Sequence, residues 1–389
     1  MDLILYYSLL ILVSCLSTIW VFKKILRIAI DKNIVDNPDA RKLQRVPVPV
    51  LGGMAVYFGI ISALAVAGML KDMSSLFEMG CVMTILLLVG MIDDIISLSA
   101  KTRFIVEVLV VIALLCSNGY SINHFHGLFG LELISDWIAV PLTVIACVGI
   151  INAINLIDGV NGLSSGFCIV ACLIWGVIFC LSGDLERASL SFICVGALLP
   201  FFFHNVFGKK SKMFIGDGGS LLIGVILSAF VINTLKADSI VAKYVPENFG
   251  LIPFTLAVLA IPVFDTLRVM TLRILRKTSP FRPDKTHLHH LMLDLHFSHV
   301  GTTATEILGN LLVVLVWWIS YRLGASVDVQ LYIVIALGVL ITFVFYKFAR
   351  VQERKKTIIY NTLIKIGDMT HVGHKHWFEW LTRSLDKGC

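Results

Sequence analysis

Charged residues are scarce in this sequence. Asp, Glu, Lys and Arg make up 15% of its 389 residues, while 57% are hydrophobic. A water-soluble domain carries about 25% charged residues on average, so the composition excludes an ordinary soluble protein. Cysteine patterns are also missing, because the nine cysteines include no CxxC pair and no zinc-ligand spacing. They therefore indicate free thiols within apolar stretches and not a disulfide framework.

Long apolar runs fill most of the chain instead. Each is close to the ~20 residues that a helix needs to cross a ~30 Å hydrocarbon core. About eleven such runs occur, at 3–22, 50–70, 76–93, 103–118, 137–154, 163–182, 186–204, 219–235, 250–270, 303–322 and 329–348. The sequence therefore predicts an all-α polytopic membrane protein with about eleven transmembrane helices. We expect a membrane domain at 1–348 and a basic and aromatic tail at 349–389.

The distribution of basic residues predicts the orientation. With the N-terminus outside, 27 of the 32 Lys and Arg residues fall in cytoplasmic segments and 5 fall outside. Cytoplasmic loops of membrane proteins carry such an excess, so we expect a cytoplasmic C-terminus. The first run has no basic region before it and is followed by Lys23, Lys24 and Arg27. It therefore predicts a retained span and not a cleaved signal peptide. The net charge of +6 calls for no nucleic acid partner.

Acidic residues gather at the cytoplasmic ends of the predicted spans. Asp93, Asp94, Asp158, Asp217 and Asp265 all lie there in this orientation. A single carboxylate at a helix end is often only solvated, but ionisable groups near membrane depth are costly and usually functional. Five of them on one membrane face favour a site.

The densest polar segment runs from Asn152 to Gly162. Asn152, Asn155, Asp158 and Asn161 recur every three residues, so they would share one face if the helix continued that far. Such a face offers oxygen ligands to a hard cation and amides to a nucleobase. A hydrogen-bonding seam between two helices is the alternative interpretation.

Two further segments offer anion-binding chemistry. Phe214 to Ser220 is a glycine-rich turn that contains Asp217 and opens a predicted span on the cytoplasmic side, where a helix N-terminus attracts phosphate. The loop from Ser279 to His290 carries three imidazoles and two cations. We interpret it as a set of donors for a diphosphate, with a zinc site or a structural loop as alternatives.

A basic loop precedes the second span. It carries Arg41, Lys42 and Arg45, and its position predicts contact with a lipid phosphate at headgroup depth. A topogenic anchor, which only fixes the orientation of the chain, is the alternative.

Together, these segments resemble the polyprenyl-phosphate N-acetylhexosamine-1-phosphate transferase family. The resemblance rests on DxPxxRK at 36–42, the Asp93-Asp94 pair, NAxNxxDGxxGL at 152–163, FxGDxGS at 214–220 and SPFxxDxxHxHH at 279–290. The HxHH spacing is similar to the branch that transfers N-acetylglucosamine-1-phosphate (GlcNAc-1-phosphate) to undecaprenyl phosphate, whereas the peptidoglycan branch carries three adjacent His.

The resemblance implies a role for each matching residue. Phe214 would stack on uracil and Asn161 would hydrogen-bond it. The implied catalytic residues are Asp93, Asp94, Asp158 and His290. The implied substrate-binding residues are Arg41, Lys42, Arg45, Asn152, Asn161, Phe214, Arg282, His287 and His289. The implied metal ligands are Asp217 and Asn155, which would bind Mg²⁺, with Mn²⁺ as the alternative ion.

The implied reaction transfers N-acetylhexosamine-1-phosphate from a UDP-sugar to undecaprenyl phosphate and releases UMP. It would take place at the cytoplasmic face of the bacterial cytoplasmic membrane, as the first membrane step of a cell-surface polysaccharide pathway. The expected partners are the UDP-N-acetylhexosamine, undecaprenyl phosphate and membrane lipid, and a homodimer stays open. A single displacement is favoured over a covalent aspartyl intermediate. The alternative classes are a secondary transporter, which the one-sided acids disfavour, and a CDP-alcohol phosphotransferase, whose DGxxAR spacing is missing.

Overall fold

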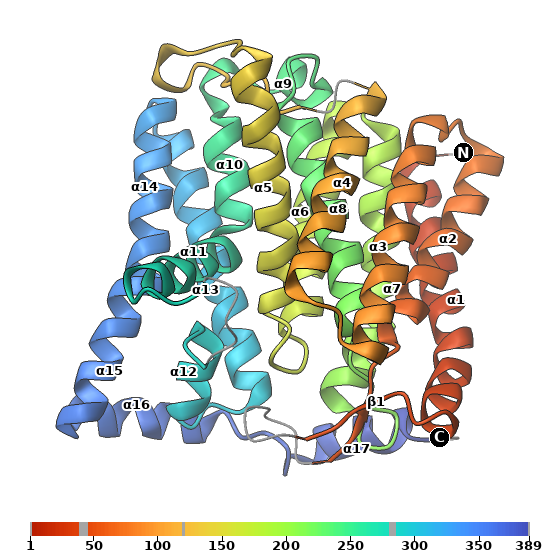
Figure 1. The fold of residues 1–389 in the computed structure, drawn as a ribbon, viewed down its shortest axis with the longest axis vertical. Coiled ribbons are helices and arrows are strands. Elements are labelled where there is room, and N and C mark those ends of the chain that lie inside the picture. The colour runs from red at the N-terminus through yellow and green to blue at the C-terminus, as the bar shows by residue number, and fades with distance from the viewer. Residues whose placement is uncertain (1, 39–45, 119–120, 280–284, 388–389) are drawn as a thin grey trace.

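The structure, a computed structural model, describes residues 2–38, 46–118, 121–279 and 285–387. Helices dominate it (Figure 1), and the described sheet is a single pair of two-residue strands, β1 Val35–Asp36 and β2 Val48–Pro49. The helices are α1 Leu3–Asp31, α2 Gly52–Leu70, α3 Phe77–Ile96, α4 Ala100–Asn118, α5 Asp136–Leu156, α6 Leu163–Ser182, α7 Leu185–Phe207, α8 Gly216–Leu235, α9 Ile240–Tyr244, α10 Leu251–Val258, α11 Ala260–Leu275, α12 Leu288–Asp294, α13 His299–Arg322, α14 Val327–Val339, α15 Phe345–Lys355, α16 Ile358–Met369 and α17 His376–Leu385.

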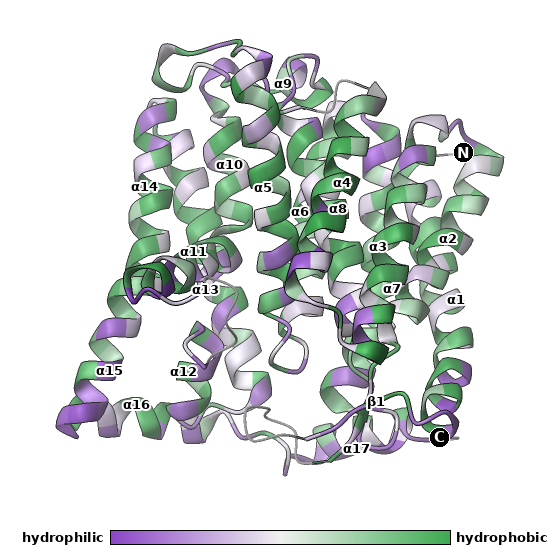
Figure 2. Cartoon of the chain, viewed as in Figure 1, coloured by the Kyte–Doolittle hydropathy of each residue, from purple (hydrophilic) through white to green (hydrophobic). Residues whose placement is uncertain are grey.

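The chain is an all-α polytopic membrane protein, as predicted. Within the described ranges, 9 helices are long and apolar enough to cross a membrane, and the bent pair formed by α10 and α11 would make 10. The remaining predicted span corresponds to α4, a 19-residue helix that carries Lys101, Arg103 and Glu107 in its first half. Figure 2 shows hydrophobic residues along the long helices and hydrophilic residues gathered around α12, α15, α16 and α17.

The predicted span at 250–270 is broken into two helices that meet at an angle of 62°. Pro262 lies just after the break and has no backbone N–H to offer the carbonyl four residues earlier, that of Val258. Asn310 on α13 donates to the Val258 carbonyl at 2.9 Å and accepts from the backbone N–H of Ile261 at 2.9 Å. One amide side chain therefore satisfies both sides of the break, as a membrane interior requires.

The helix α8 is the centre of the bundle and is fully buried over its apolar window. It packs against α2, α3 and α5. The backbone of its first turn packs directly against the backbones of α2 and α3. A Cβ on Gly53 of α2 would lie 2.4 Å from Gly219, and a Cβ on Gly90 of α3 would lie 2.3 Å from the nitrogen of Gly218. Small residues allow this close approach of membrane helices. As a result, the start of α8 lies against the ends of α2 and α3.

The C-terminal segment leaves the bundle at the end opposite to the start of α1 (Figure 1). The predicted boundary between 348 and 349 falls inside α15, which continues to Lys355. The amphipathic helices α16 and α17 then run across that end of the bundle.

We predict that the end with α16 and α17 faces the cytoplasm, because the positive-inside distribution requires it. A reporter enzyme fused after Cys389 should behave as cytoplasmic, and one inserted at 236–249 should behave as external. The two fusions control for each other, and the opposite behaviour at either site would contradict the eleven-span orientation.

Candidate active site

The helix ends near the start of α8 enclose a polar cavity of about 470 Å³. Its wall combines residues far apart in the sequence, from the loop before α2 to the segment after α11. The residues that line it are Asp36, Val50, Asp93, Asp94, Ser97, Asn155, Asp158, Gly159, Val160, Asn161, Asn205, Phe214, Gly216, Asp217 and His290. Most of the predicted site residues that the structure describes therefore meet in one cavity, whereas Asn152, His287 and His289 do not line it.

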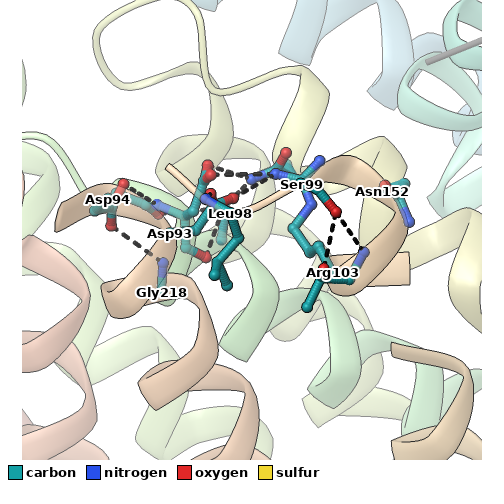
Figure 3. Close-up of polar contacts among 12 residues, drawn as sticks. Asp93, Asp94, Leu98, Ser99, Arg103, Asn152 and Gly218 are labelled. Atoms are coloured by element: carbon teal, nitrogen blue, oxygen red, sulfur yellow. Dashed lines mark hydrogen bonds and ion pairs between the residues drawn. The ribbon is translucent and has the colours of Figure 1, made fainter. Parts of the chain in front are cut away.

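Asp94 holds the first turn of α8. Its carboxylate accepts from the backbone N–H of Asp217 at 3.1 Å and from that of Gly218 at 3.4 Å (Figure 3). A helix N-terminus presents unpaired N–H groups and a positive dipole end, so a carboxylate there is stabilised. Gly216 has a φ of +72°, and a Cβ there would lie 2.5 Å from Asp94 Oδ2. The predicted glycine-rich turn is therefore required by the position of Asp94.

Arg103 lies between two of the predicted carboxylates. Its Nη1 is 3.2 Å from Asp93 Oδ2 and 3.1 Å from Asp217 Oδ2. Asp93 Oδ1 also accepts from the N–H of Leu98 at 2.6 Å, so the end of α3 fixes its direction (Figure 3). The guanidinium supplies the positive charge that two neighbouring carboxylates need. The sequence places Arg103 near Asp93 and Asp94 and among the cytoplasmic charges, but gives no sign of its contact with Asp217.

Asn155 completes the group around Asp217. Its Nδ2 donates to Asp217 Oδ1 at 2.8 Å and to Ser220 Oγ at 2.8 Å. One turn earlier, Asn152 donates to the carboxylate of Glu107 and to the carbonyl of Val148. Glu107, a buried acid that the sequence did not single out, also lies 3.6 Å from Arg103 Nε. It therefore supports Asn152 and Arg103 from behind the cavity.

The helix that carries Asn152 and Asn155 does not continue to Asn161. It ends at Leu156, and Gly162 turns the chain back with a φ of +78°. The helix does not continue far enough to give the four residues a common face, yet the turn still brings Asp158 and Asn161 into the cavity. Burial raises the pKa of Asp158 well above its usual value, and the charges of Asp217 and Asp94 raise it further.

Buried Asn205 on α7 joins two of the loops around the cavity. Its Oδ1 accepts from the N–H of Gly162 at 2.7 Å, and its Nδ2 donates to the carbonyl of Met213 at 2.8 Å. Phe214 follows at once, and its N–H donates to the carbonyl of Pro49 at 2.8 Å. The backbone of Phe214 is thus held beside the cavity by both neighbouring segments. Asn205 carries no motif of its own and was missed.

The three imidazoles of the His loop have different surroundings. The His290 side chain lines the cavity, and burial together with the nearby His287 and Lys285 lowers its pKa to about 4. His290 is therefore neutral at pH 7 and offers one N–H donor. His289 is buried against the turn after α5, because a Cβ on Gly159 would lie 2.6 Å from its Nε2. Gly159 is thus needed for the contact between the two loops.

Asp265 fastens the His loop to α11. It accepts from His287 Nδ1 at 2.8 Å, from Arg268 Nη2 at 2.6 Å and from the N–H of Leu288 at 3.2 Å. The buried His287 therefore binds a carboxylate, and its Nε2 has no hydrogen-bond partner among the described residues. Its predicted direct contact with substrate stays a prediction. Asp265 was noted among the acids but not assigned to the site.

Some predictions fall outside the described residues. Arg41, Lys42, Arg45 and Arg282 belong to the two segments, 39–45 and 280–284, for which no placement is described.

Within the described part of the chain, no group of three or more His, Cys, Asp or Glu residues is arranged to hold a metal ion. Carboxylate and amide oxygens are nevertheless the ligands that Mg²⁺ prefers, and Arg103 shows that a positive charge fits between Asp93 and Asp217.

Fold and site together define a polytopic membrane protein with an acidic polar cavity at one end of its helices. Residues 76–235 match the family model of glycosyl transferase family 4, and the chain belongs to this family.

Curated relatives match most of the chain. A Bacillus subtilis protein named as a probable undecaprenyl-phosphate N-acetylglucosaminyl 1-phosphate transferase is 32% identical over 289 residues, which cover 74% of this chain and 77% of the relative. Undecaprenyl-phosphate alpha-N-acetylglucosaminyl 1-phosphate transferases are 29% identical in Salmonella typhi, over 77% of this chain and 79% of theirs, and 29% identical in Escherichia coli K12, over 70% and 72%. The predicted membership of this family and branch is confirmed.

We predict that Asp265→Asn destabilises the protein. Removing one charge of a buried ion pair costs roughly 3–5 kcal/mol, because the partner, here Arg268, stays buried without compensation. Thermal unfolding in detergent should show a large loss, and Asp265→Leu combined with Arg268→Met should recover part of it. Asp238→Asn is the matched control, since this acid is 75% exposed in the loop between α8 and α9. Equal unfolding temperatures for Asp265→Asn and the control would contradict the prediction.

Proposed function

We propose that this protein transfers N-acetylhexosamine-1-phosphate, with GlcNAc-1-phosphate as the favoured group, from its UDP-sugar to undecaprenyl phosphate, and releases UMP. The cavity is the observation that carries the proposal. It combines a carboxylate cluster, an aromatic ring and amides at the place where α3 and α5 end and α8 begins. The names of the relatives supply the donor sugar and the lipid acceptor.

The reaction is a phosphoryl-type transfer between two anions. An oxygen of the lipid phosphate attacks the β-phosphorus of the UDP-sugar, the bond from that phosphorus to the bridging oxygen breaks, and UMP leaves with the bridging oxygen. The second pKa of a phosphomonoester is about 6, so the attacking phosphate is already largely dianionic at pH 7. A strong base is therefore unnecessary, and the main task is to bring the anions together.

Asp217, Asp93 and Asn155 are the residues that would hold Mg²⁺. When bound, the ion would neutralise charge on the diphosphate and help the leaving group depart. The backbone N–H groups at the start of α8 are fixed by Asp94, so Asp94 keeps Asp217 in place. Asp93 is held by Leu98 and Arg103 at the cavity wall. A single displacement needs only such positioning, and we favour it over a covalent aspartyl intermediate.

The donor is bound by the remaining wall of the cavity. Phe214 offers an aromatic face for uracil, and Asn161 offers an amide whose backbone is held by Thr303, which donates to its carbonyl at 2.9 Å. Neutral His290 offers an N–H to the diphosphate, and Asp158 also belongs to the cavity wall. The basic segment with Arg41, Lys42 and Arg45 is proposed to bind the acceptor phosphate.

A second cavity is the proposed binding site of the lipid chain. It measures about 420 Å³ and is lined by apolar side chains of α5, α8, α10, α11 and the loop before α5. Gly149 and Ile150 belong to its wall and lie within about one turn of Asn152 on α5. A polyprenyl chain in this cavity would place its phosphate near the polar cavity, at the face that we assign to the cytoplasm of a bacterial inner membrane.

We predict that purified protein releases UMP from UDP-GlcNAc or a close UDP-N-acetylhexosamine when undecaprenyl phosphate is present. An uncharged sugar needs no cation for a peptide carboxylate, so UDP-N-acetylmuramoyl-pentapeptide should give no UMP. The measurement is UMP release with a panel of UDP-sugars, with reactions that lack the lipid as the control. Preference for the peptide-bearing donor would overturn the proposed donor, and no release with any donor would overturn the reaction.

A second prediction concerns the metal. Asp217→Asn should lower kcat by at least about 100-fold, because metal assistance supplies several kcal/mol and each ~1.4 kcal/mol is a factor of ten. The variant should still insert and purify, since Arg103 and Asn155 keep their other contacts. Chelator-treated wild-type protein should be equally slow and recover with Mg²⁺ or Mn²⁺. Asp238→Asn is the control, and full activity in chelator would disprove a metal-assisted reaction.

A further inference from the structure

The C-terminal helices α16 and α17 cross one end of the bundle between two groups of loops (Figure 1). On one side lies α12, which begins within the His loop at Leu288. On the other side lies the loop at 208–215, which contains Phe214 and leads into the start of α8. The segment from 357 to 387, which we name the strap, is attached to both groups.

The first attachment joins the strap to the turn after α12. Ser298 donates from its backbone N–H to Thr370 Oγ1 at 2.8 Å and from its Oγ to the carbonyl of Thr370 at 2.7 Å. His371 Nε2 lies 2.9 Å from the carbonyl of His296. Gly367 touches the same turn so closely that a Cβ would lie 2.1 Å from the carbonyl oxygen of Leu295. This contact leaves α12 and its two His residues little freedom to move relative to α16.

The second attachment is a carboxylate bound by backbone. Asp386 accepts from three consecutive N–H groups, those of Lys209 at 3.2 Å, Lys210 at 3.1 Å and Ser211 at 3.0 Å, and from Ser211 Oγ at 2.8 Å. Successive N–H groups of this kind form a concave anion site. In addition, Thr382 Oγ1 donates to the carbonyl of Phe207 at 2.8 Å. The strap therefore fixes the loop three residues before Phe214.

We propose that the strap sets the position of the two donor-binding loops relative to each other, and that Asp386 is a positioning residue for the UDP-sugar. The inference rests on the proposed function, because Phe214 and His290 must contact the nucleotide and the diphosphate of one molecule. Asp386 lines no part of the cavity, so it acts only through the loop at 208–215. Releasing that loop lowers the fraction of molecules whose site is ready for the donor.

Steady-state kinetics of full-length protein test this inference. If Asp386→Ala leaves about a tenth of the molecules in the binding-competent arrangement, the KM for UDP-GlcNAc rises about tenfold while kcat stays unchanged, because saturating donor selects the competent arrangement. Asp386→Asn keeps one acceptor oxygen and should lie between Asp386→Ala and the wild type. Glu379→Ala is the matched control, since this acid lies on α17, which ends just before Asp386, and pairs only with the exposed Arg383 among the described residues. A lower kcat at unchanged KM would mean a purely structural role and would overturn the proposal.

Hydrogen–deuterium exchange without substrate separates the strap from the proposed reaction. The amides of residues 208–211 should exchange faster in Asp386→Ala than in the wild type, and Glu379→Ala should leave their exchange unchanged. Unchanged exchange in Asp386→Ala would overturn the attachment itself. If the wild type released no UMP while exchange still responded to Asp386→Ala, the proposed reaction would fail and the attachment would stand.

Discussion

The N–H groups at the start of α8 are the point on which the rest of the site depends. Asp94 binds them, and glycines at 53, 90, 218 and 219 let α2 and α3 approach until backbone meets backbone. This packing brings Asp217 within reach of Arg103 and Asn155, which belong to two other helices. Without the close approach, the acids would stand at separate helix ends in water, and each would be only a solvated carboxylate.

Arg103 supplies a positive charge to this acidic cluster. Asp93 and Asp217 lie close together because one guanidinium serves both, and Glu107 holds that guanidinium from the opposite side. One guanidinium thus offsets part of the charge of Asp93 and Asp217, whereas Asp158 still lies near the like charges of Asp217 and Asp94. The same arrangement leaves the pair suited to a second cation, since oxygen ligands and a tolerance for positive charge are already present.

Much of the fold and of the site could be predicted from the sequence, because both leave local patterns. Apolar runs identify the spans, and Asp94, Asp217, Asn155 and Phe214 lie in motifs that the structure brings to one cavity. Residues that act through distant partners leave no such pattern. Asn205 is a lone amide in an apolar helix. The predicted span at 137–154 comes within two residues of the end of α5 at Leu156, but the spacing of three could not show whether the helix continued to Asn161, since it suits a helix and a turn alike.

The His loop illustrates a further limit. His287, His289 and His290 are almost adjacent in sequence, yet they face a buried carboxylate, a glycine turn and the cavity respectively. Composition alone treats them as equivalent donors. Their different roles arise because the loop is fastened to α11 by Asp265, 22 residues earlier, which a local pattern does not reveal.

The break between α10 and α11 has an evolutionary consequence. Asn310 is matched to one particular interruption, because it donates to the carbonyl that Pro262 leaves unpaired and accepts from the amide of Ile261. If the proline were lost, the helix could straighten, and the Asn310 amide would then lie in an apolar core without its two hydrogen-bond partners. If the asparagine were lost, the carbonyl would face hydrocarbon alone. The two positions are 48 residues apart in the sequence, and they should therefore change together or not at all across homologues.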